Sequence, residues 1–267
     1  MLVIGELINS TRKEVKEALQ SRDEAVIRRL ARCQIEAGAD VLDVNTAESR
    51  KRELEDLEWA INLIYDEVGN ETRLSIDSPN PKAVARGLEL CHSHPLVNSI
   101  SNDPKVQEAL LPSLKQYKAD VIGLTMGSGK GMPMTVEARL EEAEVLIKSL
   151  QSHNFPLQNL YIDPLAMTIG SNQEQAQAVI DTIRAIKERW GNIGVKTSVG
   201  LSNVSYGLPK RSVVNRAFLA MLLEAGLDAA LIDPTDVGMM DILKGSEALL
   251  GTDTYCLGYI KHMRSQN

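Results

Sequence analysis

The stretch "EAGADVLDVN" (residues 36–45) holds, in ten letters, the end of a helix, a stop and a buried strand. Gly38 stands where a helix should end. The run "VLDV" that follows is apolar and β-branched, as a buried strand requires, and it closes on polar residues. A second version, "EAGLDAALID" at 224–233, lies near the other end of the chain. This repetition predicts a unit in which a helix leads into a parallel strand.

Six further runs of strand character lie at residues 2–6, 73–77, 96–100, 120–125, 160–163 and 195–203. Helical periodicity fills the stretches between them, and parallel strands need such crossovers. Eight units in 267 residues give about 33 residues each, the size of a βαβ element. The sequence therefore predicts an α/β fold of the closed (β/α)8 TIM-barrel type, formed by one domain over residues 1–267.

The helical stretches show one-sided apolar spacing, as at Leu54, Leu57, Ile61, Ile64 and Val68. Ser21 with Glu24, and Ser171 with Glu174, have the spacing of a capping box, which predicts helix starts at both places. Gly69 and Gly226 are expected to end helices.

Charge and composition exclude several classes of protein. The chain has 29 basic and 36 acidic residues and a net charge of −7, which argues against a nucleic-acid-binding face. Its three cysteines predict neither a disulfide framework nor a zinc site. No uncharged apolar run approaches the roughly 20 residues that span a bilayer. We expect a cytoplasmic protein that binds neither nucleic acid nor membrane.

Polar side chains gather at the predicted strand ends, where the active site of a barrel lies. They are Glu6, Asp43, Asn45, Asp77, Asn98, Thr125, Asp163, Ser202, Asn203 and Asp233. Any single one is equally well explained as a helix cap or turn former. Together they predict a pocket of hydrogen-bond acceptors and amides.

The ligand of this pocket can be narrowed by chemistry. No histidine stands at a strand end, so no metal site is expected. The glycine-rich stretch "MGSGKGMP" (126–133) does not fit the frame of a phosphate-binding P-loop. Carboxylates and carboxamides suit a flat heterocycle with alternating donors and acceptors, such as the edge of a pterin.

Several short blocks occur in an order that resembles a known family. They are "GELIN" (5–9), "LDVN" (42–45), "IDSPN" (76–80), "VNSIS" (97–101), "IGLTM" (122–126), "LYIDPL" (160–165), "GLSNVS" (200–205), "NRAFLAM" (215–221) and "GLDAALID" (226–233). The chain resembles, over essentially its whole length, the pterin-binding methyltransferases that act with corrinoid proteins in anaerobic bacteria, such as methyltetrahydrofolate:corrinoid/iron-sulfur protein methyltransferase. It departs from their pattern after "LDVN" and in the loops "MGSGKGMP" and "MTIGS".

The resemblance implies roles for matching residues. Asp77, Asn98 and Asp163 match positions that hold the pterin ring, and Asn203 matches the asparagine that reaches N5, the nitrogen that carries the methyl group. Ser202 and Gly200 belong to the same block. The residues that hold the ring would in turn be supported by Glu6, Asn9, Asp43, Asn45 and Asp233. The folate tail or a partner protein would contact Lys210 and Arg211.

The resemblance also implies the reaction and the partners. A methyl group would pass between N5 of (methyl)tetrahydrofolate and the cobalt of a corrinoid (cobalamin), in a direction that the sequence leaves open. The chain lacks the Asp-x-His-x-x-Gly motif of corrinoid domains, so a separate corrinoid protein would supply that cofactor. A homodimer without a bound metal is expected. The alternatives are a dihydropteroate synthase, a non-catalytic pterin-binding protein, and an unrelated barrel enzyme that uses Asp77 and Asp163 for acid/base chemistry.

Overall fold

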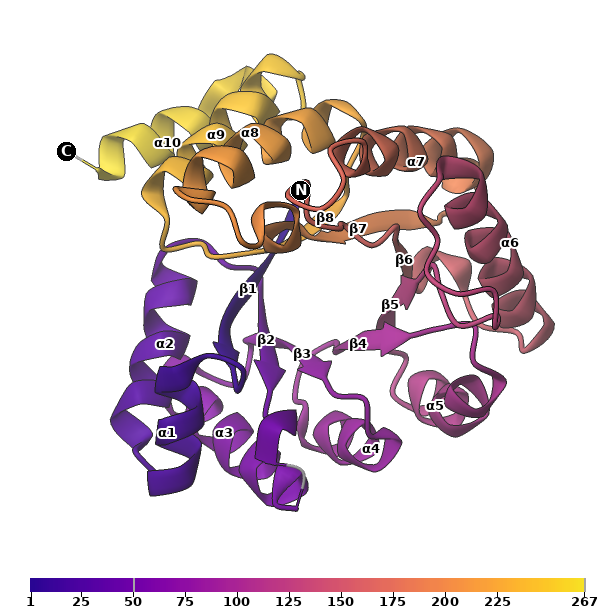
Figure 1. The fold of residues 1–267 in the computed structure, drawn as a ribbon. Helices are drawn as coiled ribbons and strands as arrows, with labels where there is room; N and C mark the ends of the chain where they lie inside the picture. Colours follow the sequence, from indigo (N-terminus) through magenta and orange to yellow (C-terminus); the bar gives the residue numbers. More distant parts are fainter. Residues whose placement is uncertain (50, 267) are drawn as a thin grey trace.

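The chain forms a closed barrel of eight parallel strands in sequential order, which confirms the predicted TIM barrel (Figure 1). The computed structural model describes residues 1–49 and 51–266. The strands are β1 (Leu2–Asn9), β2 (Val41–Asn45), β3 (Arg73–Asp77), β4 (Leu96–Ile100), β5 (Asp120–Leu124), β6 (Leu160–Asp163), β7 (Lys196–Gly200) and β8 (Ala229–Ile232).

Helices surround the barrel on the outside (Figure 1). They are α1 (Lys13–Ser21), α2 (Glu24–Glu36), α3 (Glu53–Val68), α4 (Pro81–Leu90), α5 (Pro104–Gln116), α6 (Val136–Ser152), α7 (Gln175–Trp190), α8 (Arg211–Glu224), α9 (Val237–Leu249) and α10 (Leu257–Ser265). Their apolar faces pack against the outer face of the strands in two large clusters of buried residues. The last helix, α10, packs on α9.

A third, smaller cluster fills the inside of the barrel, with Ile4, Val41, Leu96, Ile122, Tyr161 and Ala229 at its centre. Successive strand residues point to opposite faces, so a residue two places further along points inward again, one layer closer to the carboxyl end. This rule brings Glu6, Asp43, Asn98 and Asp163 into the top layer. The mouth of the barrel is polar because the apolar pattern of the inner layers ends below it.

Strand β1 is longer than predicted and is irregular at its centre. Its pairing with β2 shifts register between Gly5 and Ile8. At that point the buried Gln34 of α2 accepts a hydrogen bond from the Leu7 N–H at 2.9 Å. A Cβ atom on Gly5 would lie 2.5 Å from Gln34 Oε1, so the shift requires glycine there. The strand then continues to Asn9 and presents both Glu6 and Asn9 at the mouth.

Other expectations need correction at the element boundaries. Helix α2 is capped by Asp23, whose side chain accepts from the Ala25 N–H, while Ser21 is the last residue of α1. Helix α7 begins at Gln175, and the Ser171–Glu174 capping box does not form. Strand β7 ends at Gly200, and a 3-10 turn (Leu201–Ser205) follows where the sequence predicted strand. The helix end predicted at Gly69 is confirmed, since Gly69 is the C-cap of α3.

Candidate active site

The polar strand ends surround two adjoining hollows at the mouth of the barrel. The first, of about 400 Å³, is lined by Asn98 and Asp163 together with apolar side chains of the β6–α7 loop. The second, of about 280 Å³, is lined by Glu6, Asn9, Asp43 and Asp77 among others. Gly200, Asn203 and Leu231 line both. The structure therefore brings the predicted ring-binding residues and Asn203 together around one continuous space.

Asp43 and Asp77 form a carboxylate pair at the base of the second hollow. Asp43 is 1% exposed, and it accepts from Ser75 Oγ at 2.7 Å and from Asn98 Nδ2 at 3.3 Å. Asp77 accepts from Asn45 Nδ2 at 2.9 Å. Asn45 is itself fixed, since its Oδ1 accepts from Ser10 Oγ at 2.8 Å. Residues from β2, β3 and β4 thus orient each other before any ligand arrives.

Burial raises the pKa of both carboxyl groups, and they are linked to each other. The pKa of Asp43 is raised well above its ordinary value, by burial and by the charge of Asp77 beside it. The pKa of Asp77 is raised by burial and lowered by hydrogen bonds from Asn45 and from Asp43. Burial and the charge of its neighbour therefore favour the protonated form most strongly at Asp43.

Glu6 connects this pair to the Asn203 segment. Its Oε1 accepts from Ser202 Oγ at 2.7 Å. Burial raises the pKa of Glu6, with a smaller rise from the charge of Asp233, while the Ser202 hydrogen bond and the charge of Arg12 lower it. Glu6 thus connects β1 to the turn that follows β7.

Asp163 lines the first hollow and is held by backbone donors. Its Oδ1 accepts from the Leu165 N–H at 2.7 Å and its Oδ2 from the Gly200 N–H at 3.1 Å. Burial raises the pKa of Asp163 to about 6, against the lowering effect of these two hydrogen bonds and of the charge of Arg139. The carboxylate is ionised at neutral pH and titrates just below it.

Asn203 stands on the 3-10 turn and is exposed to the mouth. Within residues 1–49 and 51–266, no hydrogen bond to its carboxamide is formed, so the group is available to a ligand. A Cβ atom on Gly200 would lie 3.2 Å from Asn203 Nδ2, which explains the glycine before the turn. Arg211 fixes the turn from outside by donating to the Ser202 carbonyl and to Ser205 Oγ.

The remaining predicted residues have more local contacts. Asn9 lines the second hollow, and its Oδ1 accepts from the N–H and the hydroxyl of Thr11. Asp233 accepts in the same way from Thr235 after β8, outside the lining of both hollows. Lys210 is exposed and has left-handed backbone angles (φ 48°) ahead of α8.

Two residues at or near the site, Arg12 and Arg139, were missed by sequence reasoning. Arg12 lines the second hollow from the β1–α1 loop. The sequence leaves open whether Tyr206 roofs the pocket or packs the loop; it is 71% exposed and lines the first hollow. Arg139 lies behind the site on α6 and is fully buried. Arg12 comes three residues after the true end of β1, so the correct strand length would have revealed it. Nothing in the sequence around Arg139 distinguishes it from an exposed helix arginine.

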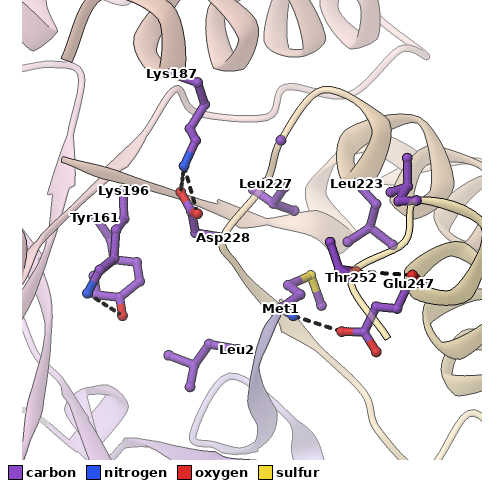
Figure 2. A pocket seen from close by; sticks show the side chains of 12 residues that line it. Met1, Leu2, Tyr161, Lys187, Lys196, Leu223, Leu227, Asp228, Glu247 and Thr252 are labelled. Atoms are coloured by element: carbon purple, nitrogen blue, oxygen red, sulfur yellow. Dashed lines mark hydrogen bonds and ion pairs between the residues drawn. The ribbon is translucent and has the colours of Figure 1, made fainter. Parts of the chain in front are cut away.

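The opposite end of the barrel has a hollow of about 510 Å³ whose charged groups have partners among the residues that line it (Figure 2). Lys187 Nζ lies 2.8 Å and 2.9 Å from the two carboxylate oxygens of Asp228. The amino group of Met1 lies 2.7 Å from Glu247 Oε1. Lys196 Nζ lies 3.3 Å from the hydroxyl of Tyr161, as its close pairing in Figure 2 shows.

In residues 1–49 and 51–266, no group of three or more His, Cys, Asp or Glu side chains is placed to hold a metal ion. In the same residues, no helix has the length and apolar character needed to cross a membrane.

Comparison with known proteins identifies the class to which this barrel and mouth belong. The chain belongs to the pterin binding enzyme family, whose profile matches residues 5–233. It is 34% identical over 266 residues to the methylcorrinoid:tetrahydrofolate methyltransferase of Eubacterium limosum, an alignment that covers 99% of this chain and 96% of that protein.

Two more distant similarities agree with this placement. The chain is 29% identical over 250 residues to the methionine synthase of Mycobacterium leprae, which covers 89% of this chain and only 20% of that much longer protein. The dihydropteroate synthase of Xanthomonas albilineans, solved with 7,8-dihydropteroate, has the same fold with a TM-score of 0.67 and 17% identity, over 93% of each chain. The last comparison concerns the fold alone.

Proposed function

We propose that this protein is a methyltransferase that moves a methyl group between the cobalt of a protein-bound corrinoid and N5 of tetrahydrofolate. The single observation that carries the proposal is Asn203, an unengaged carboxamide shared by two hollows that contain Asp77, Asn98 and Asp163. The name of the relative that is 34% identical over nearly the full chain supports the same reaction, in the direction of tetrahydrofolate.

The carboxylates would bind the pterin ring. The edge of a pterin carries several N–H donors, and an ionised carboxylate can accept two neighbouring donors at once. Asp77 and Asp163 are acceptors fixed by neighbours, and Asn98 adds a carboxamide that can donate and accept. A rigid, partly desolvated set of acceptors loses little entropy when the ring binds.

Asn203 would act at N5. In transfer to tetrahydrofolate, the N5 lone pair forms the new N–CH3 bond, the electron pair of the carbon–cobalt bond stays on cobalt, and N5 releases its proton to a base. The Asn203 carboxamide oxygen can accept a hydrogen bond from protonated N5, and its NH2 can donate to neutral N5. It cannot itself be the acid or the base, so water must carry the proton. A donor or acceptor aimed at developing charge typically contributes about 2.7–4 kcal/mol.

Further groups would complete the reaction from outside this pocket. A separate corrinoid protein is the proposed partner, since the chain lacks the Asp-x-His-x-x-Gly motif. Lys210 is exposed and free to meet that partner or the anionic folate tail. Arg211 is engaged with the Asn203 turn, so its proposed role becomes the support of that turn. Arg12 adds a cation at the mouth. By the family resemblance, we also propose a cytoplasmic homodimer in which this chain binds no metal.

The test is methyl transfer between corrinoid and folate, assayed in both directions with Asn203→Ala. We expect the rate to fall about 100- to 1,000-fold, the effect of removing one such group, while tetrahydrofolate affinity measured by calorimetry changes much less. Asn62→Ala, an exposed asparagine on the outer face of α3, is the matched control. Unchanged turnover in N203A would refute the proposed role of Asn203.

Two other outcomes would favour the alternative functions. Absence of folate binding by the wild-type protein would favour unrelated acid/base chemistry, and condensation of p-aminobenzoate with a pterin diphosphate would identify a dihydropteroate synthase.

A further inference from the structure

Arg139 is the most deeply buried charged side chain behind the pterin pocket. It lies in α6 with 0% of its surface exposed. An arginine in such a position must have its donors satisfied and its charge balanced, because an isolated buried charge is strongly disfavoured. The partners that satisfy it therefore indicate what it does.

Two of its four hydrogen bonds go to the loop that follows Asp163. Nε donates to the Pro164 carbonyl at 2.7 Å, and Nη2 donates to the Leu165 carbonyl at 3.3 Å. Nη2 also meets Gln175 Oε1 at 2.6 Å, at the start of α7. Gln175 in turn donates to the Met134 carbonyl at 3.1 Å, and Arg139 Nη1 reaches the same carbonyl at 3.4 Å. One guanidinium group thus joins the β5–α6 loop, the β6–α7 loop and α7.

The turn that Arg139 holds is one that the chain would not adopt unaided. Leu165 has a φ of +64°, in the left-handed region that costs a non-glycine residue about 1–2 kcal/mol. The same residue donates its N–H to Asp163 Oδ1. The turn that Arg139 holds therefore also fixes the Asp163 carboxylate, which lines the first hollow.

Arg139 also supplies charge. Among the described residues Arg139 forms no ion pair with a carboxylate, and its charge acts on Asp163, the acid at the head of the loop that it holds. The residue after β5, Thr125, donates its N–H to the main-chain carbonyl of Asp163, and Gly200 at the end of β7 donates to the carboxylate. The cation behind the pocket and the anion facing it thus compensate each other across a single turn.

We propose that Arg139 is a positioning residue of the pterin pocket, which holds the Pro164–Leu165 turn and keeps Asp163 an oriented, anionic acceptor for the ring. The inference rests on the proposed function for the identity of the ring. It adds that pterin affinity depends on a residue that never touches the ligand. It also predicts a specific signature, a change in the pH dependence of binding and not a uniform loss.

The pH dependence has a definite sign. Burial raises the pKa of Asp163 to about 6 and the Arg139 charge opposes that rise. Without the charge, the pKa of Asp163 rises further, and the acceptor becomes protonated at a higher pH. Glu6, Asp43 and Asp77 line the other side of the mouth and have raised pKa values too. The informative quantity is therefore the difference between variants in the pH at which Asp163 titrates and in the pH dependence of binding.

The experiment compares R139M, R139Q, R139K and Q175L with the wild type. Tetrahydrofolate affinity is measured by calorimetry from pH 5.5 to 8.5, and the titration of the Asp163 carboxyl is followed by ¹³C NMR in the ligand-free protein, assigned with D163N. We expect the two neutral variants to raise the titration midpoint by about one pH unit, with binding about threefold weaker near pH 6.5, about eightfold weaker at pH 5.5, and recovering at pH 8.5. R139K keeps the charge and should keep the midpoint. Q175L loosens the same cluster without removing the charge, and it should weaken binding equally at all pH values.

Clear outcomes would overturn the proposal. If R139K shifts the midpoint as far as R139M does, or if the neutral variants leave the Asp163 titration unchanged, Arg139 has only a structural role. R139Q can still donate to the Pro164 carbonyl, and R139K keeps both charge and donor, so the comparison survives if R139M does not fold. The NMR titration needs no folate. It therefore decides the Arg139 proposal even if the protein fails to bind tetrahydrofolate, which would count against the proposed function alone.

Discussion

At the amino end of the barrel, Asp228 receives two contacts from Lys187 and a third hydrogen bond from the Thr197 N–H at 2.8 Å. Asp120, also at that end, meets both Arg73 and His94. At the carboxyl end, Asp43, Asp77 and Asp163 are held by amides, a hydroxyl and backbone N–H groups, and the described residues form no ion pair with them. The same residue type is paired with lysine or arginine cations at one end and held by hydrogen bonds, without an ion pair, at the other.

The difference separates groups that stabilise the fold from groups kept for a ligand. A carboxylate paired with a cation is satisfied, and little is gained by binding something else. A buried carboxylate that only accepts hydrogen bonds keeps a raised pKa, which lowers the stability of the folded protein at neutral pH. Such a cost is typical of active sites, where a ligand supplies the missing partner.

The largest effect should come from removing the charge of an acceptor at the mouth. We expect Asp77→Asn to weaken tetrahydrofolate binding at least about 100-fold, because hydrogen bonds to a charged acceptor contribute roughly 1.5–3 kcal/mol each and an amide places donors against donors. Binding is measured by calorimetry at pH 8. Retention of wild-type affinity would mean that the ring does not contact Asp77. The circular dichroism spectrum of the variant should remain that of the wild type.

The matching change at the amino end should give the opposite pattern. Asp228→Ala leaves Lys187 without its partner and removes the acceptor of the Thr197 N–H. Since Asp228 and Lys187 are 27% and 33% exposed, we expect a loss of about 2 kcal/mol in the free energy of unfolding, less than for a fully buried pair. Urea titration measures it. Folate affinity should be unchanged, and a comparable loss of affinity would erase the functional distinction between the two ends.

The contrast between the ends shows how far the sequence can be read. Strand periodicity and the polar strand ends were enough to predict the barrel and to place Asp77, Asn98 and Asp163 at its mouth. The length of β1 was not predictable, because the register shift at Gly5 depends on Gln34, which lies 29 residues further along the chain. Arg139 was missed for the same reason. Three of its partners, Pro164, Leu165 and Gln175, lie 25 to 36 residues away, and only the folded chain brings them together.

The predicted starts of α2 and α7 were wrong for a local reason. Ser21 has the capping-box spacing with Glu24. Asp23, however, stands directly before the helix, and its carboxylate accepts a hydrogen bond from the Ala25 N–H at 3.1 Å. The sequence offers two candidate N-cap residues within three positions. At this position a carboxylate is also favoured by the positive end of the helix dipole. Short-range signals fix such a boundary only to within a few residues.

A third variant tests whether the mouth carboxylates destabilise the folded protein. For Asp163, the folded pKa of about 6 lies above the unfolded value of about 3.9. The folded state therefore binds more protons between these values, and stability falls as pH rises through that window, by about 3 kcal/mol in total. Asp163→Asn removes this loss but also replaces one good acceptor of a backbone N–H with a donor. We expect a net gain of about 1–2 kcal/mol at pH 8, measured by urea titration, and a net loss at pH 4. A variant less stable than the wild type at both pH values would contradict this account of the site.

The smallest expected effect concerns the geometry of Asn203. In Gly200→Ala the new methyl group would lie 3.2 Å from Asn203 Nδ2, and the backbone at Gly200 (φ −72°) accepts alanine without strain. The carboxamide must move by a few tenths of an ångström, while Asp77 and its supporting residues do not contact the new atom. Because misplacement by 1 Å can cost about 100-fold in rate, we expect methyl transfer to slow several-fold with tetrahydrofolate affinity reduced less than twofold. Single-turnover rates measure the first quantity and calorimetry the second. An equal loss in both would place Asn203 among the groups that only bind the ring, whereas a loss confined to the rate would assign it to the transfer step.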